Sequence, residues 1–424
     1  MKRLLLFVLT VAVLVAAAVW LADRPGEVTV HWQGWRIDTT VPVLAVALLL
    51  LLAAMDVLLR VGRFVVGGPS RLLAARRSRR VRDGYRALSD GLAAVASGDR
   101  DRSRKLAKKA DRLLADRSLT GLLTAQAAEL AGDQDEARRR FQDMVGRPET
   151  AFLGLKGLLE LALKDKDHEA ALDYARRAWA LNAGGDGLAA TLFELQAGAG
   201  QWSEAELTLD EARRRKAMTL PELGRRRALV LDARAAAAEA ANASDALALA
   251  VKAHEADPAF VPATVRAARL LSAAGKDRKA RAVVEAAFRI APHPALTAAW
   301  SALVPDEAPL EWVKRLDRLV KTNPLAPEGH IALAEAALAA RLWGQARHHL
   351  EAALAKRPSQ GCYRLLARIE RDEKKDEAAA QAWLAKAADA PVDPAWRCGQ
   401  CNGVAAEFTP ACPHCGAVDG LAWR

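Results

Sequence analysis

Aromatic side chains are scarce in this 424-residue chain, where they make up 5% of residues although 52% are hydrophobic. A single large core would normally recruit more bulky side chains, whereas thin, alanine-rich layers need few. The sequence also lacks a Gly-x-Gly-x-x-Gly run opening a strand–turn–helix unit, which argues against a dinucleotide-binding enzyme. Its eight histidines are not spaced as a nucleophile or acid–base constellation, so we predict no catalytic residue and no enzymatic activity.

Small residues recur at intervals of about 34 positions through most of the chain. The repeated positions are Ser103, Ala137, Ala171 and Ala205 and, after one 41-residue step, Ala246, Ala280, Trp312, Ala346 and Ala380, of which only Trp312 is not small. The residues four and seven places after each of these positions are apolar, which marks one face of a helix. A period of this length is typical of tetratricopeptide solenoids, in which small residues let paired helices approach closely.

We therefore predict an all-α fold with about nine helical hairpins over residues 85–392. Glycines five places before the repeated position, such as Gly98 and Gly275, should lie in the turn within a pair. Prolines twelve places after it, such as Pro258 and Pro292, should end one helix before the next begins. The 41-residue step predicts lengthened helices near residues 220–246. The competing interpretation is a set of unrelated amphipathic helices.

Two apolar segments, residues 4–22 and 41–59, are each long enough to cross a bilayer as a helix. Basic residues precede the first segment and follow the second, so both chain ends should lie in the cytoplasm and the loop between them in the periplasm. A cleaved signal peptide is the alternative for the first segment. Asp56 lies near the end of the second, four residues before Arg60, which favours an ion pair over a proton relay.

Eight arginines and no acid occur from Arg60 to Arg82, and they supply much of the formal charge of +11. For arginines 71 to 82, the position beside the membrane favours anionic lipid headgroups as the partner, and nothing aromatic interleaves this arm as nucleic-acid binding would require. No nucleic-acid partner is therefore predicted. In the external loop, Val28, Val30 and Trp32 alternate with polar residues, which predicts a small hairpin turning at Gly34.

The order of these parts resembles the HemY family of proteobacterial inner-membrane proteins. The resemblance rests on two N-terminal spans, a joining stretch from Ala22 to Val28 that runs into a Trp-containing strand, a basic exit and tetratricopeptide-like repeats. It implies an inner-membrane protein associated with late steps of haem (protohaem, or porphyrin) biosynthesis, with no catalytic activity of its own. No axial haem ligand can be nominated, so binding of haem or porphyrin stays open.

The C-terminal tail contains two Cys-x-x-Cys pairs separated by ten residues. They are Cys398 and Cys401, then Cys412 and Cys415. Two such turns present four thiolates to one tetrahedral metal ion, the arrangement of a zinc ribbon or a rubredoxin-like module. We predict a structural zinc ion bound by these four residues, while iron also suits four thiolates. His414 is interpreted as a bystander and Cys362 as a helical packing residue.

A membrane tether, repeats and a four-cysteine module are also found together in LapB-type adaptors of lipopolysaccharide assembly. LapB-like proteins have one N-terminal span, whereas two are predicted here, so the haem-pathway association ranks first and a LapB-like adaptor second. An electron-transfer protein with iron in the cysteine module is a third hypothesis, which a red colour of the purified protein would support.

The predicted organisation has four parts. Residues 1–60 form two transmembrane helices joined by a periplasmic hairpin, and residues 61–84 a basic juxtamembrane linker. Residues 85–392 form the repeats, and residues 393–424 the four-cysteine module. The predicted mechanism is scaffolding, in which the repeats bind partner proteins at the inner leaflet and the module caps or extends the binding surface.

Overall fold

The computed structural model describes residues 8–9, 11–13, 15–17, 19–20, 23, 26–114, 116–181 and 186–424, and these are predominantly helical. Contacts divide the chain into two compact units, residues 1–133 and 134–424. About half of the predicted first span, residues 4–22, is described, in the short helical pieces 8–9, 11–13, 15–17 and 19–20. The structure therefore does not test the prediction of two spans.

A small hairpin precedes the long helix of the first unit. Strands β1 (Glu27–Trp32) and β2 (Trp35–Thr40) pair antiparallel, with Trp32 opposite Trp35. The two turn residues, Gln33 and Gly34, both have positive φ, at 48° and 89°. Positive φ at both positions belongs to the tight turn that matches the twist of paired strands. The predicted turn at Gly34 is thus confirmed.

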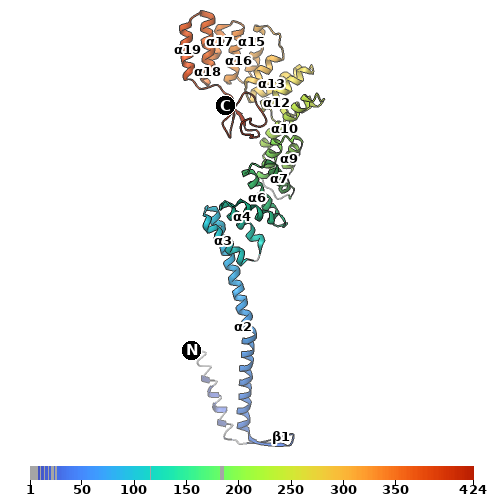
Figure 1. Ribbon diagram of the computed structural model, residues 1–424, viewed down its shortest axis with the longest axis vertical. Helices are drawn as coiled ribbons and strands as arrows, with labels where there is room; N and C mark the ends of the chain where they lie inside the picture. Colours follow the sequence, from blue (N-terminus) through green and yellow to red (C-terminus); the bar gives the residue numbers. More distant parts are fainter. Residues whose placement is uncertain are drawn as a thin grey trace. The chain divides into compact units, whose positions relative to one another are not determined.

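Helix α2 (Val41–Ala96) is 56 residues long and appears in Figure 1 as one rod leading from the hairpin to α3. At 1.5 Å per residue it measures about 84 Å. Its first part, Val41–Gly62, has a mean hydropathy of 2.6 and no buried residue, so this helix is long and apolar enough to cross a membrane. The predicted ion pair of Asp56 with Arg60 is present at 2.7 Å. Residues 61–84, predicted as a linker, continue the same helix.

The remaining helices follow in hairpin order. They are α3 (Arg100–Leu113), α4 (Arg117–Leu130), α5 (Gln134–Val145), α6 (Ala151–Lys164), α7 (His168–Ala180), α8 (Asp186–Gly198), α9 (Trp202–Arg215), α10 (Leu220–Ala240), α11 (Ala246–Ala256), α12 (Val261–Ala273), α13 (Asp277–Ile290), α14 (Pro294–Ala302), α15 (Pro309–Val320), α16 (Pro327–Ala339), α17 (Trp343–Lys356), α18 (Gln360–Ile369), which ends in a π-helical turn at Glu370–Lys374, and α19 (Glu377–Asp389).

The nine repeated positions all fall in odd-numbered helices, from α3 to α19, and all except Trp312 are buried. In the second unit each helix packs against the next, and even-numbered helices from α10 to α18 also contact the next even-numbered helix. This is the packing of a helical-hairpin solenoid, and it confirms the predicted fold class. Helix α10, at 21 residues, accounts for the 41-residue step.

Several turns within the hairpins place a residue with positive φ just before the next helix, and in some of them a side-chain cap follows. Gly98 has φ 74°, and the Asp99 carboxylate then accepts a hydrogen bond from Arg102 N. Lys166 takes the same place with φ 59° and is followed by the cap Asp167. Glycine adopts this conformation without the steric cost that a Cβ brings, and each cap contributes about 1 kcal/mol. The prediction that glycines such as Gly98 occupy these turns is confirmed.

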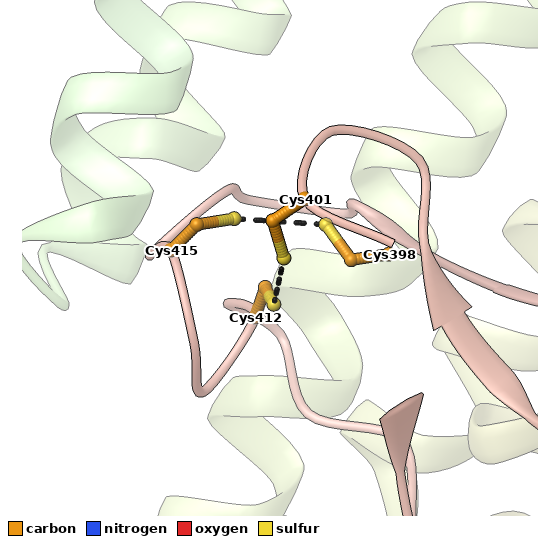
Figure 2. A group of neighbouring side chains, drawn as sticks. All are labelled: Cys398, Cys401, Cys412 and Cys415. Atoms are coloured by element: carbon orange, nitrogen blue, oxygen red, sulfur yellow. Dashed lines mark hydrogen bonds between the residues drawn. The ribbon is translucent and has the colours of Figure 1, made fainter. Parts of the chain in front are cut away.

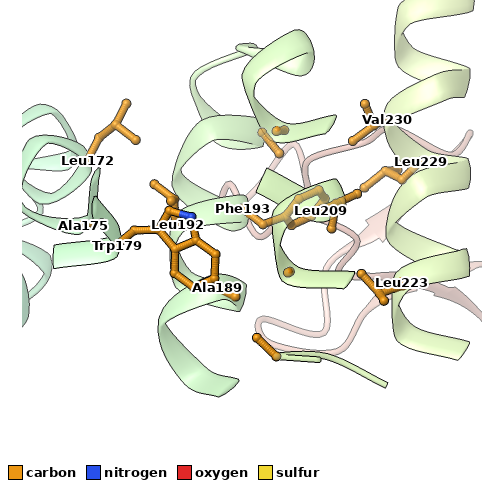
Figure 3. Close-up of a cluster of buried hydrophobic side chains, with 14 of the residues drawn as sticks. Leu172, Ala175, Trp179, Ala189, Leu192, Phe193, Leu209, Leu223, Leu229 and Val230 are labelled. Carbon is orange, nitrogen blue, oxygen red and sulfur yellow. The ribbon is translucent and has the colours of Figure 1, made fainter. Parts of the chain in front are cut away.

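The core is a series of local clusters rather than one centre. The largest runs through helices α6 to α12, and Figure 3 shows it around Trp179, Phe193 and Leu229. Further clusters lie around Phe288 and Leu316, and around Leu350. Each fully buried Leu or Phe contributes about 1.5–3 kcal/mol. The scarcity of aromatic residues therefore reflects thin layers, each a helix pair deep.

Candidate metal centre

The four-cysteine module follows α19 and is built on a small sheet. Strands β3 (Trp396–Cys398), β4 (Val404–Ala405) and β5 (Leu421–Trp423) pair antiparallel in the order β4-β3-β5. Cys398 ends β3, and Cys401 follows in the turn before β4. Cys412 and Cys415 belong to a second turn before β5. The sheet thus fixes the first pair of cysteines, and the second pair returns to meet it.

The four sulfur atoms converge, as Figure 2 shows, and all lie within 4.8 Å of one another. Cys398 Sγ is 3.6 Å from Cys415 Sγ, and Cys401 Sγ is 3.8 Å from Cys412 Sγ. Four sulfurs about 2.3 Å from a central zinc ion would stand about 3.8 Å apart at the corners of a tetrahedron. A disulfide requires about 2.05 Å. The four cysteines can therefore hold one metal ion, and their spacing fits four thiolates around it.

The surrounding backbone favours ionised sulfur. The N–H groups of Gln400 and Gly403 donate to Cys398 Sγ and Cys401 Sγ, each at 3.4 Å. Backbone hydrogen bonds from Cys401 and Gln400 lower the pKa of Cys398 to about 6. A backbone hydrogen bond from Ala417 lowers the pKa of Cys415. Burial and the neighbouring thiols of Cys401 and Cys398 outweigh this effect and raise the pKa of Cys415 to about 12. Several thiolates repel one another unless a cation lies between them, so this cluster suits a divalent ion.

The other two residues singled out near the module have structural surroundings. His414 Nε2 lies 3.1 Å from the carbonyl oxygen of Val404 in the other Cys-x-x-Cys half, so it links the two halves rather than joining the sulfur cluster. Cys362 lies fully buried in α18, within the cluster around Leu350 and Leu366. The packing role predicted for Cys362 agrees with this position.

The module folds back against the middle of the solenoid. Arg225 of α10 donates two hydrogen bonds to Asp419, at 3.0 and 2.7 Å. Phe260, which precedes α12, meets Phe408 edge to face with ring centroids 5.2 Å apart. The Arg225 guanidinium lies 4.3 Å over the ring of Phe260. Since these contacts lie on α10 and at the start of α12, the module does not extend the solenoid beyond α19.

His293 completes this docking surface at the start of α14. Its ring centroid lies 5.2 Å from that of Trp396 and 4.3 Å from that of Trp423. Its Nδ1 accepts a hydrogen bond from Ala295 N and caps the helix, while the buried Nε2 has no partner within the described residues. Burial lowers the pKa of His293 to about 4, so this ring is neutral at physiological pH.

No local sequence pattern marks these docking residues. Arg225, Phe260 and His293 lie 194, 148 and 103 to 130 residues from the module residues they contact. Arg225 stands in a run of three arginines, and His293 stands beside prolines like any loop residue. Only the return of the tail to the even-numbered helices brings them to the module.

Comparison with known proteins agrees with this organisation. The HemY protein N-terminus family matches residues 26–132. The probable magnetosome protein Mms48 of Magnetospirillum gryphiswaldense is 30% identical over 425 aligned positions, which cover 99% of this chain and 93% of that protein. The chain belongs to the HemY family. The match to the HemY N-terminus covers the β1–β2 hairpin, α2, α3 and α4, so this membrane-proximal part carries the family's sequence signature.

Solved structures also resemble this HemY-family chain at low TM-scores. A tetratricopeptide repeat protein from Parabacteroides merdae is 14% identical, with a TM-score of 0.28, over 56% of this chain and 93% of that one. The TPR2AB domain of yeast Sti1, solved in complex with an Hsp90 peptide, is 14% identical, with a TM-score of 0.27, over 74% of this chain and 99% of that one.

Proposed function

We propose that this HemY-family chain is a membrane-tethered scaffold that binds partner proteins at the cytoplasmic face of the bacterial inner membrane and serves haem biosynthesis. The observation that carries the proposal is one continuous helix, α2, which contains both the membrane-crossing segment and the first helix of the repeat stack. A protein built in this way positions other molecules, and it acts by binding rather than by catalysis. The haem pathway follows from the family association.

The physical gain of such a scaffold is local concentration. Two partners held by one stack at one membrane site meet more often than they would in bulk solution. In this proposal two N-terminal spans contact membrane lipid, and both termini are cytoplasmic. The four cysteines bind zinc, whose role is structural because the buried cluster within this short module is small.

A second candidate comes from the relative in Magnetospirillum gryphiswaldense, which is named as a probable magnetosome protein. Identity of 30% over nearly the whole of both chains favours a shared mechanism. In this version the same scaffold serves a specialised membrane compartment, and its partners are proteins of that compartment. The two candidates differ in the partner and not in the chemistry of the stack.

The test is crosslinking and co-purification from native membranes, together with porphyrin measurement after depletion of the protein. The haem candidate predicts co-purified haem-biosynthesis enzymes and accumulated porphyrin intermediates, both restored by the wild-type gene. As a matched control, a variant whose residues 41–62 are replaced by an unrelated membrane span should also restore them, because the span serves as an anchor. Unchanged porphyrins with altered lipopolysaccharide would instead support a LapB-like adaptor and reject the haem role.

A further inference from the structure

The first helical hairpin, formed by α2 and α3, carries most of the chain's excess positive charge. Between residues 76 and 112 there are thirteen cations and five acids, compared with a formal charge of +11 for the whole protein. The cations are Arg76, Arg77, Arg79, Arg80, Arg82, Arg86, Arg100, Arg102, Arg104, Lys105, Lys108, Lys109 and Arg112. All thirteen are exposed. We call this surface of α2 and α3 the cationic hairpin.

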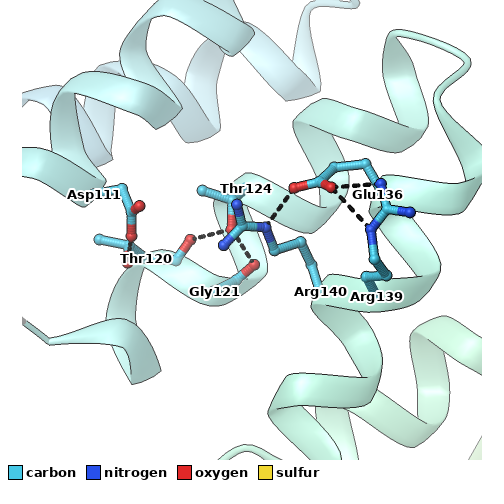
Figure 4. Close-up of polar contacts among 7 residues, drawn as sticks. All are labelled: Asp111, Thr120, Gly121, Thr124, Glu136, Arg139 and Arg140. Carbon is cyan, nitrogen blue, oxygen red and sulfur yellow. Dashed lines mark hydrogen bonds and ion pairs between the residues drawn. The ribbon is translucent and has the colours of Figure 1, made fainter.

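These cations are not neutralised by the protein itself. In the part of the chain that the structure describes, none of the thirteen lies within 4.0 Å of a carboxylate oxygen. Arg80 and Arg112 instead donate to backbone carbonyl groups. Among the five acids, Asp111 accepts a hydrogen bond from the Thr120 hydroxyl, shown in Figure 4, and Asp99 caps α3. The positive field of the cationic hairpin is therefore available to a partner.

Arginines of the second unit behave differently. Glu136 pairs with both Arg139 and Arg140 in α5, as Figure 4 also shows. Arg266 of α12 pairs with Asp232 at 2.8 Å, and many other arginines of this unit have a carboxylate partner. Arginine is thus used in the second unit to hold the solenoid together. The cationic hairpin also contains many arginines, but these arginines do not pair with carboxylates among the described residues.

An apolar stripe runs along α2 between these cations. Val81, Tyr85 and Leu92 are 40%, 50% and 41% exposed, and their spacing of four and seven residues places them on one face of the helix. A shallow concavity there is lined by Val81, Tyr85, Arg77, Arg82 and Ser78. Exposed apolar side chains flanked by cations match a helix that is apolar on one face and acidic beside it.

Distance separates this surface from the bilayer. Because α2 is continuous, Arg76 lies about 21 Å and Arg86 about 36 Å along the helix from Gly62, where the membrane segment ends. Charge interactions in solution are screened over about 8–10 Å at physiological salt. A helix that leaves the bilayer upright therefore carries most of these cations out of range of lipid headgroups.

We propose that the cationic hairpin docks an acidic amphipathic helix of a partner protein. The apolar face of that helix lies on Val81, Tyr85 and Leu92, and its carboxylates meet Arg77, Arg82 and neighbouring cations. This inference rests on the proposed scaffold function and adds the chemistry of one partner and the surface that receives it. A second copy of this chain does not fit, because two surfaces of like charge repel each other.

The experiment uses the full chain in nanodiscs of phosphatidylcholine, which carry no net charge. The probe is a fluorescent synthetic helix of about twenty residues, with leucine on one face and glutamate on the other, and binding is followed by anisotropy. The test variant is Arg77→Gln/Arg82→Gln/Arg86→Gln, which leaves Arg80 and its hydrogen bond to α3 in place. We expect about tenfold weaker binding at low salt, since each exposed pair contributes several tenths of a kcal/mol.

The matched control removes three exposed charges from α13 with Arg278→Gln/Lys279→Gln/Arg281→Gln. It changes the net charge equally and should change the affinity less than about twofold. Circular dichroism of both variants should equal that of the wild type, because Gln and Arg have similar helix propensities. Equal weakening by both variants would indicate attraction by net charge alone and overturn the proposal, as would unchanged binding by the test variant. Tyr85→Ala should weaken binding at every salt concentration, since it removes apolar contact.

The same assay distinguishes the acidic helix from lipid headgroups and from nucleic acid. In nanodiscs that contain phosphatidylglycerol the peptide should bind as before, and loss of binding there would assign the surface to lipid headgroups. A single-stranded RNA that binds more tightly than the peptide through the same arginines would assign it to nucleic acid. If the peptide does not bind while partner proteins still co-purify from membranes, the docking surface is refuted and the scaffold function stands. If the peptide binds but no partner co-purifies, the scaffold function fails.

Discussion

The ion pair between Arg225 and Asp419 is expected to hold the four-cysteine module on the solenoid. It is bidentate, and its side chains are 32% and 21% exposed, so it is better sheltered than a surface pair. Exposed pairs contribute about 0.2–1 kcal/mol, and charge-assisted bidentate pairs more, so we expect about 1.5 kcal/mol here. Arg225 also covers Phe260, which adds about 0.5 kcal/mol. The predicted losses are therefore about 1.5 kcal/mol for Asp419→Ala and about 2 kcal/mol for Arg225→Ala.

The double variant should lose about 2 kcal/mol, because the pair can be lost only once, which gives a coupling free energy of about 1.5 kcal/mol. The assay is hydrogen exchange of residues 395–424, read as the free energy of local opening, since a solenoid need not unfold in one step. The exposed pair Lys314–Glu311, whose side chains are 60% and 58% exposed, is the control and should couple by less than about 0.5 kcal/mol. A coupling near zero for Arg225 and Asp419, or a larger loss for Asp419→Ala than for Arg225→Ala, would refute this account of docking.

Three further predictions concern the metal centre, pH and one turn. Purified protein should contain one zinc ion per chain by elemental analysis. The Cys401→Ser variant should lose this zinc ion, and the Cys362→Ser variant should keep it. A red protein that contains iron would contradict the zinc assignment. Since the pKa of His293 is about 4 in the folded protein and about 6.5 unfolded, the unfolded chain binds more protons between these values. Docking stability should therefore fall by about 2 kcal/mol from pH 7 to pH 5, and hydrogen exchange of His293→Asn, which keeps a helix cap, should show a smaller fall. Hydrogen exchange should also show that Lys166→Gly stabilises the turn between α6 and α7 by about 1 kcal/mol, because Lys166 has positive φ. Gly132→Ala should destabilise the turn that contains Gly132 for the same reason. No change in either variant would contradict the left-handed conformations.

Much of the fold could be predicted because its determinants are local and repeated. A solenoid packs each helix against its neighbours in sequence, so the period of small residues already specifies which faces meet. Ala171 and Ala205 are buried for this reason, and Gly98 stands in a turn that needs positive φ. The clustering of the two cysteine pairs could also be predicted, because two residues between thiolates are sufficient for one metal-binding turn.

Other features depend on long-range contacts or on how far a helix continues. Nothing local marks Arg225 or His293 as a partner of the C-terminal module, because each contact closes a loop of more than a hundred residues. The basic segment after the membrane span was predicted to lie on lipid, since its sequence neighbours are membrane residues. In the structure this segment is part of the continuous α2, which runs on from the membrane-crossing segment to α3.

The sequence by itself therefore determined the repeat, the segment apolar enough to cross a membrane and the two Cys-x-x-Cys pairs, since each is set by residues within a few helical turns of one another. Tertiary structure alone decided that the tail returns to α10 and to the starts of α12 and α14, and that many arginines of the second unit are paired with carboxylates. The arginines of the cationic hairpin, in contrast, have no carboxylate partner among the described residues. Such pairings depend on which surfaces meet after the helices have stacked, and side chains that look alike in the sequence acquire different partners at that stage.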